Sequence, residues 1–371
     1  MSERWAQTFA GRSALVTGHT GFKGSWLTIW LHRLGAKVTG YALPPPTEPS
    51  NFVASGVQDL LRAHHEADVR DATRLERAIR EADPDFIFHL AAQALVRESY
   101  QAPRETFETN VMGTVNVLEA VRKSGRPCVV VVVSSDKCYE NREQVWGYRE
   151  IDPMGGHDPY SASKGAAELV VASYRRSFFP PDRIAQHGVK LASVRSGNVI
   201  GGGDWSQDRI VTDMVRSLAA GRAVPIRSPQ AVRPWQHVLE PLSGYLTLAA
   251  RMLESDDPRW CQAWNFGPLP GEELTVSQLT DLMLRAWGEG RWQDVSDPGQ
   301  FHEARVLLLS IEKALHELKW RPRWYLSEAV RRTVEWYRTF YRGAGSMLNA
   351  CLSDIAAYES AECSPQEVRP R

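Results

Sequence analysis

Short apolar runs alternate with amphipathic stretches along the first half of the chain. Strand-like runs occur at 13–17, 37–41, 85–90, 128–134 and 191–195. The helical stretches between them predict a parallel sheet that helices cover on both faces. Five successive valines at 129–133 suit a central strand that is buried on both sides. We therefore expect an α/β fold with a doubly wound parallel sheet.

After about residue 196 the pattern changes to glycine clusters, proline-bounded turns and amphipathic helices, with two helices predicted over 211–218 and 276–287. The apolar segment 263–267 is expected to return as a strand to the sheet or its rim. We predict a first domain over 1–190, a smaller C-terminal α/β lobe over 191–345 that closes over a ligand, and a tail over 346–371 with a short helix ending near Tyr358.

A glycine-rich turn lies between the first predicted strand and a predicted helix. Gly18, Gly21 and Gly24 follow the strand 13–17 and precede the apolar run 25–31. Glycines let the backbone approach a pyrophosphate, and free N–H groups at the start of the helix point at the anion. The order strand, turn, helix predicts a Rossmann-type dinucleotide site, whereas a flexible turn is the alternative for such glycines taken alone.

Tyr160 and Lys164 lie four residues apart, so one helical turn places a phenol and an ammonium on the same face. A neighbouring cation lowers the pKa of a tyrosine toward working pH, which makes a general base for a sugar hydroxyl. The alternative is a surface pair on a helix rich in serine and alanine. The upstream glycine turn favours the catalytic interpretation.

Charge and cysteine content argue against several other functions. Lys plus Arg and Asp plus Glu number 44 each, so no overall charge attracts nucleic acid or an anionic membrane. The five cysteines show no CxxC or paired spacing, so we predict neither a disulfide framework nor a metal site. No signal core or bilayer-spanning apolar run is found, and we expect a protein of the reducing cytoplasm.

Together the glycine turn, the segment around Asn110 and the Tyr160/Lys164 pair resemble the extended short-chain dehydrogenase/reductases that act on nucleotide sugars. Within this family the chain is most similar to the CDP-glucose 4,6-dehydratases, through segments 17–27, 134–139 and 195–205. The resemblance implies NAD as cofactor, CDP-D-glucose as substrate and a homodimer with a four-helix interface. An acidic residue is expected about 20 residues after the glycine turn, but Tyr41-Ala42-Leu43 stands at that place. The preference for NAD over NADP therefore follows from the resemblance and from the lack of an arginine near Ala42.

The resemblance also implies roles for individual residues. The catalytic group is Ser135, Asp136, Lys137, Tyr160 and Lys164. The cofactor group adds Gly18, Thr20, Gly21, Phe22, Lys23, Gly24, Asp68, Val69, Ala91, Ala92, Gln93 and Asn110 to Tyr160 and Lys164. For the substrate we choose residues by chemistry: Ser135 at the sugar oxygen, Arg233 and Arg209 as cations for the diphosphate, Asn198 at the phosphates, and Trp205 as a stacking ring. Core packing is the alternative role for Trp205. Asn110 is interpreted as a structural or proton-relay amide in the sheet, and a helix-capping asparagine is its alternative.

In the implied reaction, Tyr160 takes the proton of the glucose 4-hydroxyl while hydride leaves C4 for NAD. Lys137 stands where the related dTDP-glucose dehydratases carry a glutamate, and it must be neutral to remove the C5 proton. Burial and Lys164 are expected to lower the pKa of Lys137. Asp136 protonates the departing 6-hydroxyl, and hydride returns to C6.

Two other functions compete with this interpretation. A nucleotide-sugar 4-epimerase shares the fold, but it needs no acid and base for water loss, so Asp136 and Lys137 argue against it. A non-catalytic NAD-binding sensor is disfavoured by the intact set of Ser135, Tyr160 and Lys164. The expected product is typical of pathways to 6-deoxy or 3,6-dideoxy sugars of surface polysaccharides such as O-antigen lipopolysaccharide.

Overall fold

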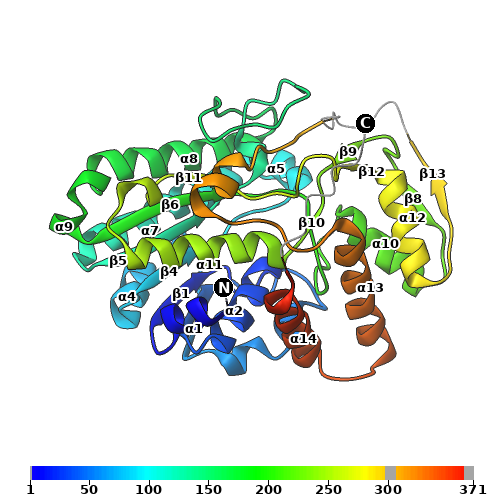
Figure 1. The fold of residues 1–371 in the computed structure, drawn as a ribbon, viewed down its shortest axis with the longest axis horizontal. Coiled ribbons are helices and arrows are strands. Elements are labelled where there is room, and N and C mark those ends of the chain that lie inside the picture. The colour runs from blue at the N-terminus through cyan, green and yellow to red at the C-terminus, as the bar shows by residue number, and fades with distance from the viewer. Residues whose placement is uncertain (1, 297–305, 363–371) are drawn as a thin grey trace.

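The computed structural model describes residues 2–296 and 306–362. Seven parallel strands form the central sheet in the order β11-β6-β5-β4-β1-β2-β3 (Figure 1). They are β1 (Ser13–Thr17), β2 (Lys37–Ala42), β3 (Ala63–Glu66), β4 (Phe86–His89), β5 (Cys128–Val133), β6 (Val189–Arg195) and β11 (Ala263–Asn265). Because the chain order reverses between β1 and β4, the sheet is doubly wound, which confirms the predicted fold class.

Helices cover both faces of this sheet. On one face lie α1 (Ser2–Phe9), α2 (Phe22–Arg33), α11 (Leu239–Glu254) and α14 (Met347–Ser360). On the other face lie α4 (Ala72–Ala82), α7 (Gly113–Ser124) and α8 (Pro159–Ser177). The valines of β5 divide between the two cores, because alternate side chains of a strand point to opposite faces.

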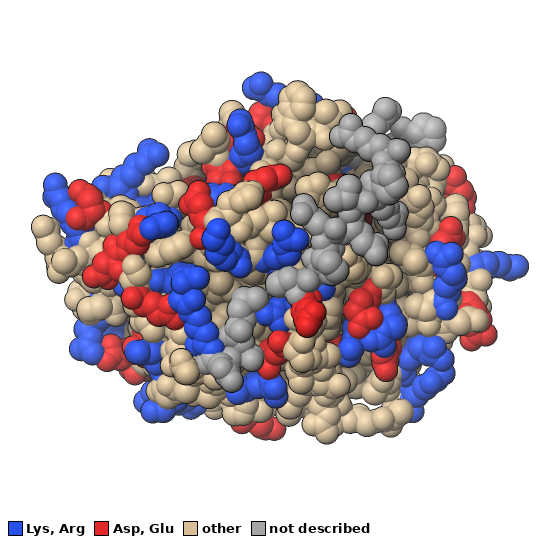
Figure 2. All heavy atoms as spheres, viewed as in Figure 1, with Lys and Arg blue, Asp and Glu red and all other residues tan. Residues whose placement is uncertain are grey.

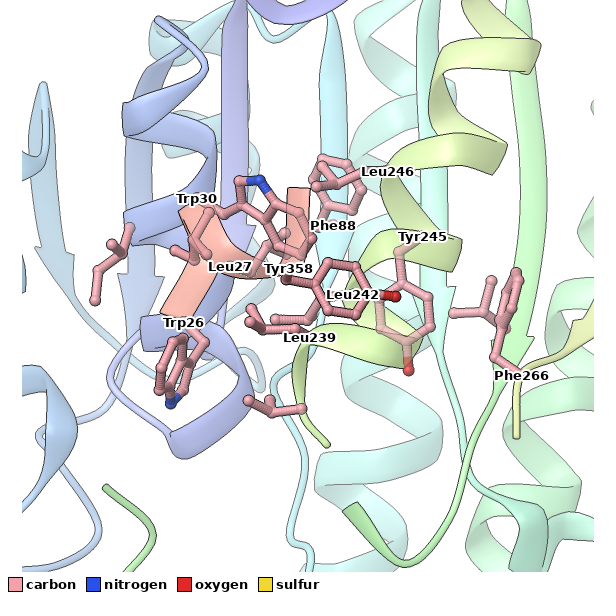
Figure 3. Close-up of a cluster of buried hydrophobic side chains, with 14 of the residues drawn as sticks. Trp26, Leu27, Trp30, Phe88, Leu239, Leu242, Tyr245, Leu246, Phe266 and Tyr358 are labelled. Atoms are coloured by element: carbon pink, nitrogen blue, oxygen red, sulfur yellow. The ribbon is translucent and has the colours of Figure 1, made fainter. Parts of the chain in front are cut away.

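Large aromatic and aliphatic side chains fill the core between α2, α11 and the sheet (Figure 3). Trp26 and Trp30 of α2 are fully buried, and Leu242 of α11 lies among them. The ring of Tyr358, from the far end of the chain, contacts Trp30 edge to face with centroids 5.7 Å apart. This core therefore contains residues from both ends of the chain.

The last helix, α14, is longer and more deeply packed than the short helix expected in a tail. It buries Cys351, Ile355 and Tyr358. Its Glu359 accepts hydrogen bonds from Trp30 Nε1 at 2.9 Å and from Arg33 Nη2 at 3.0 Å. Residues 363–371 of the predicted tail lie outside the described residues.

The segment after β6 forms most of a smaller lobe, at the right of Figure 1. Its strands are β7 (Val199–Ile200), β8 (Val224–Ile226), β9 (Val232–Arg233), β10 (Gln236–His237), β12 (Leu274–Thr275) and β13 (Trp292–Asp294), and its helices include α10 (Ile210–Ala219), α12 (Val276–Trp287) and α13 (Leu326–Arg342). Both α10 and α12 lie where the amphipathic pattern predicted helices. The domain boundary near residue 190 stays a prediction, since β6 and β11 belong to the main sheet.

Acidic and basic side chains are interspersed over the face shown in Figure 2, in keeping with their equal totals. Many of them pair locally, as Arg331 does with Glu328 along one side of α13. Within the part of the chain that the structure describes, none of the helices combines the length and apolar character needed to cross a bilayer.

Candidate active site

The glycine turn forms a tight cradle between β1 and α2. Gly18 has a φ of 74°, and a Cβ atom there would lie 2.7 Å from the backbone nitrogen of Ala91. A Cβ atom on Gly24 would lie 2.1 Å from the Gly18 carbonyl oxygen. Gly21 caps α2 without a side-chain bond. The open N–H groups of the first helical turn therefore fit the pyrophosphate of a dinucleotide.

The other loops predicted to line the cofactor site lie at the carboxyl ends of neighbouring strands. Thr20 Oγ1 donates to the Leu43 carbonyl after β2 at 2.9 Å. Asp68 follows β3 and pairs with Arg70 at 2.6 Å. Val69 packs against Gly113, where a Cβ atom would lie 2.9 Å from its side chain. Arg70 thus engages both carboxylate oxygens of Asp68, one through its backbone N–H and the other through its side chain.

Asn110 connects the loop after β4 to α8. Its Oδ1 accepts a hydrogen bond from the Gln93 backbone at 2.9 Å, and its Nδ2 donates to the Gln93 carbonyl at 3.0 Å and to Ser163 Oγ at 2.8 Å. Ala91 and Ala92 lie in the same loop, and Ala91 touches Gly18. Asn110 thus serves as a structural amide within a π-helical turn over Glu108–Met112, and it does not cap a helix.

Ser135, Asp136 and Tyr160 form a buried cluster beyond the end of β5. Ser135 Oγ donates to Asp136 Oδ1 at 2.9 Å, and Ser135 also shares a side-chain hydrogen bond with Tyr160. Asn198 Nδ2 donates to Asp136 Oδ2 at 3.3 Å. The sequence placed Asn198 on the substrate phosphates, whereas the structure places its amide on the carboxyl group of Asp136.

Tyr160 and Lys164 lie on the first two turns of α8, as the spacing predicted. Asp158 caps this helix by accepting a hydrogen bond from the Ser161 backbone at 2.9 Å. Burial raises the pKa of Tyr160 to about 12, although the bond with Ser135 and the charge of Arg209 act to lower it. Burial also lowers the pKa of Lys164 to about 8. The pKa of Tyr160 therefore shifts in the direction opposite to the prediction.

Two lysines near this cluster differ in their surroundings. Lys137 lies in the short 3₁₀ turn Asp136–Cys138 and its side chain is exposed, so the predicted burial is absent. Lys23 follows the glycine turn, but its Nζ donates to Ser196 Oγ at 3.0 Å, beyond the end of β6. Burial and the charge of Arg209 lower the pKa of Lys23 to about 7. Lys23 thus reaches the acid–base cluster rather than remaining only a backbone element of the turn.

The predicted substrate residues are only partly brought together. Arg209 pairs with Asp204 at 3.3 Å and acts electrostatically on Tyr160 and Lys23, which places it at the cluster. Arg233 lies in β9, where its Nη1 donates to the Val232 carbonyl at 2.8 Å.

Trp205, predicted to contact the substrate, is only 2% exposed. Its ring packs against Trp336 and Phe340 with centroids 5.6 and 4.8 Å away. The structure does not bring Trp205 to the cluster, because the second lobe uses this side chain as core.

Glu168 was missed in the sequence, although it follows Lys164 by one more helical turn on the same face. It forms a buried ion pair with Arg195 at 2.8 Å. Both Lys164 and Glu168 line a small pocket, together with His89 and Asn110. Among residues 2–296 and 306–362, the side chains of His, Cys, Asp and Glu form no group of three suited to a metal ion.

Comparison with known proteins agrees with this arrangement. A family model described as GDP-mannose 4,6 dehydratase matches residues 15–333. A CDP-glucose 4,6-dehydratase of Salmonella typhimurium is 50% identical over 351 residues, which cover 95% of this chain and 97% of the relative. A dTDP-glucose 4,6-dehydratase of Streptomyces antibioticus is 32% identical over 335 residues, covering 87% and 92%.

A solved structure shows the same fold. The dTDP-glucose 4,6-dehydratase of Streptomyces venezuelae, crystallised with NAD bound, superposes with a TM-score of 0.75 at 27% identity and covers 90% of this chain and 99% of its own. These matches confirm the resemblance predicted from the sequence. The chain therefore belongs to the GDP-mannose 4,6 dehydratase family.

Proposed function

We propose that this protein is an NAD-dependent hydro-lyase that converts CDP-D-glucose into CDP-4-dehydro-6-deoxy-D-glucose. The main observation that supports this proposal is the buried cluster of Ser135, Asp136 and Tyr160 near the glycine cradle. The cluster supplies both an acid and a base. The 50% identity to a CDP-glucose 4,6-dehydratase supports the same reaction and the same nucleotide.

NAD occupies the cradle in this proposal, with its pyrophosphate at the start of α2. The absence of room for Cβ atoms at Gly18 and Gly24 supports this placement. Bound NAD would supply a hydride acceptor for C4 of the sugar and a hydride donor for C6. We assign the nicotinamide ribose to Lys164, which lies one helical turn from Tyr160.

Each side chain of the cluster has one task. Tyr160 accepts the proton of the 4-hydroxyl, and Ser135 holds the same oxygen. The resulting ketone acidifies C5–H, and Lys137 removes that proton. Asp136 protonates the departing 6-hydroxyl. Asn198 Nδ2 donates to the Oδ2 atom of Asp136 at 3.3 Å. Lys137 is exposed in the free protein, so the bound sugar must cover its amine.

Cations near the smaller lobe are suited to the diphosphate of the substrate. Arg209 already lies at the cluster, and Arg233 offers a planar guanidinium that can bind a phosphate bidentately. A 4-epimerase would use the same fold, Tyr160 and Lys164. The buried Asp136 favours dehydration, because an epimerase has no leaving hydroxyl to protonate.

A substrate panel tests the proposal. The purified protein with NAD is incubated with CDP-, dTDP-, UDP- and GDP-glucose, and the products are analysed by mass spectrometry. We expect loss of one water, fastest with CDP-glucose, and deuterium placed at C4 should reappear at C6. A product of unchanged mass would indicate an epimerase, and release of the deuterium to solvent would reject internal hydride return.

We also propose a cytoplasmic homodimer that pairs through α7 and α8. Exposed apolar side chains on and near these helices support such an interface: Leu169 is 61% exposed and Met112 49%. The cysteines at 128, 138, 261 and 351 are free and buried, which suits a reducing compartment. A role in supplying deoxy sugars for surface polysaccharides follows from the proposed product.

A further inference from the structure

The proposed reaction leaves its acid and its base in the wrong protonation states. Tyr160 gains the proton of the 4-hydroxyl, and Asp136 gives one to the departing 6-hydroxyl. The C5 proton that Lys137 removes is returned to C5, so it cancels. After each turnover Tyr160 therefore carries one proton too many and Asp136 lacks one.

Ser135 lies between these two groups. Its Oγ donates to Asp136 Oδ1 at 2.9 Å, and it shares a hydrogen bond with the Tyr160 hydroxyl. Tyr160, Ser135 and Asp136 are 8%, 7% and 3% exposed. Water therefore has restricted access to all three groups, whereas a path of two hydrogen bonds connects them directly.

We propose that Ser135 returns the proton from Tyr160 to Asp136 between turnovers. Tyr160 passes its hydroxyl proton to Ser135 Oγ as Ser135 passes its own proton to Asp136 Oδ1. One O–H bond breaks and one forms at Ser135, and the products are a phenolate and a protonated carboxyl group. This single transfer restores both the base and the acid, and it needs no further reactant. The inference rests on the proposed dehydration.

The groups around both ends act on this transfer. Asn198 donates to Asp136 Oδ2, which leaves Oδ1 facing Ser135. Arg209 acts on Tyr160 as a cation and stabilises the phenolate once it forms. Burial raises the pKa of Tyr160 to about 12, and the charge of ionised Asp136 acts in the same direction, so protonation of Asp136 removes one of the two influences that oppose the phenolate.

Single-turnover and steady-state rates with CDP-glucose separate proton return from substrate positioning. In Ser135→Ala, we expect the single-turnover rate to fall about 10-fold from the lost contact with the sugar oxygen, and the steady-state rate to fall at least about 100-fold. Added imidazole, a small proton carrier, should raise the steady-state rate of this variant about fivefold or more and leave the wild type unchanged.

Matched variants guard against loss of folding. The side chains of threonine and valine have the same shape, but only threonine carries a hydroxyl group. We therefore expect the steady-state defect and the imidazole response in Ser135→Val and not in Ser135→Thr. Ser134→Ala removes a neighbouring hydroxyl that faces the pocket at Lys164, and it should keep the wild-type ratio of the two rates.

Equal falls of both rates in Ser135→Ala and Ser135→Val, without an imidazole response, would overturn the proton return and leave Ser135 as a positioning residue. The wild type is measured in the same assay. If it forms no dehydrated product, the proposed function itself fails, so the two failures are distinguishable.

Discussion

At the scale of single residues, Tyr160 is subject to opposing influences. Burial favours its neutral phenol, whereas Ser135 and Arg209 favour the phenolate. In this structure burial dominates, and the pKa of Tyr160 is about 12. The chemistry of this site therefore depends on where the phenolic proton goes as much as on nearby positive charge.

Replacing Tyr160 by phenylalanine tests its role as base. We expect Tyr160→Phe to reduce the steady-state rate by about 10³-fold, because general base catalysis is lost while the ring is kept. Binding of NAD, measured by fluorescence titration, should remain within about twofold of the wild type. Turnover close to that of the wild type would remove Tyr160 from this role.

Single side chains also mark the limit of what the sequence could predict. The spacing of Tyr160 and Lys164 specified their helix and their shared face, because that relation is local. The direction of the Lys23 side chain depends on Ser196, which lies 173 residues away in the sequence. For the same reason the sequence did not show that Lys137 is exposed, and for Trp205 it left substrate contact and core packing both open.

At the scale of elements, the start of α2 determines the shape of the cradle. Replacing Gly24 by alanine would place a Cβ atom 2.1 Å from the Gly18 carbonyl oxygen, so the turn must move away from its present path. We expect Gly24→Ala to weaken NAD binding by about 100-fold or more, since the helix N-terminus no longer meets the pyrophosphate. Equilibrium titration with NAD measures the loss.

Gly267→Ala is the control for this substitution. A methyl group at Gly267 would lie 3.4 Å from the nearest atom, which is an ordinary contact. Its NAD affinity should match that of the wild type. Unchanged NAD affinity in Gly24→Ala would show that the cradle is wider than the structure indicates.

Elements with strong apolar periodicity were predicted well, and those without it were missed. The strands β1, β2, β4, β5 and β6 and the helices α10 and α12 lie close to their expected ranges. The strand β3 reads Ala63-His64-His65-Glu66, and it pairs only with β2 at the edge of the sheet. An edge strand with half-buried or exposed polar side chains lacks the pattern that marks a buried strand, so only pairing in three dimensions shows it.

At the scale of the whole molecule, Glu240 joins α11 to the end of the chain. Its carboxyl group accepts hydrogen bonds from the backbone of Trp324 at 2.8 Å and from the Tyr358 hydroxyl at 2.5 Å. Burial raises the pKa of Glu240 to about 7, although these bonds act to lower it. The protonation of one side chain is thereby coupled to the packing of distant segments.

Stability should consequently depend on pH. Because the pKa of Glu240 is higher in the folded state than in the unfolded chain, the folded protein binds the extra proton, and stability falls as pH rises through about 7. The contribution is on the order of 3 kcal/mol between pH 5 and pH 8. We expect Glu240→Gln to reduce the difference between the melting temperatures at these two pH values.

Glu289→Gln serves as the control, because Glu289 is exposed beyond the end of α12. It should leave the pH dependence of the melting temperature as in the wild type. An identical pH dependence in Glu240→Gln would assign the effect to other groups.

The contact of α14 with α2 sets an order of events during synthesis. Trp30 and Arg33, on the helix that begins at the glycine turn, bind Glu359 near the end of the described chain. A ribosome makes the nucleotide cradle early, and Glu359 of the supporting helix follows Arg33 by 326 residues. During synthesis α2 therefore gains this support only after α14 has been made. A product that terminates before α14 would lack the support, although it would contain every predicted catalytic residue.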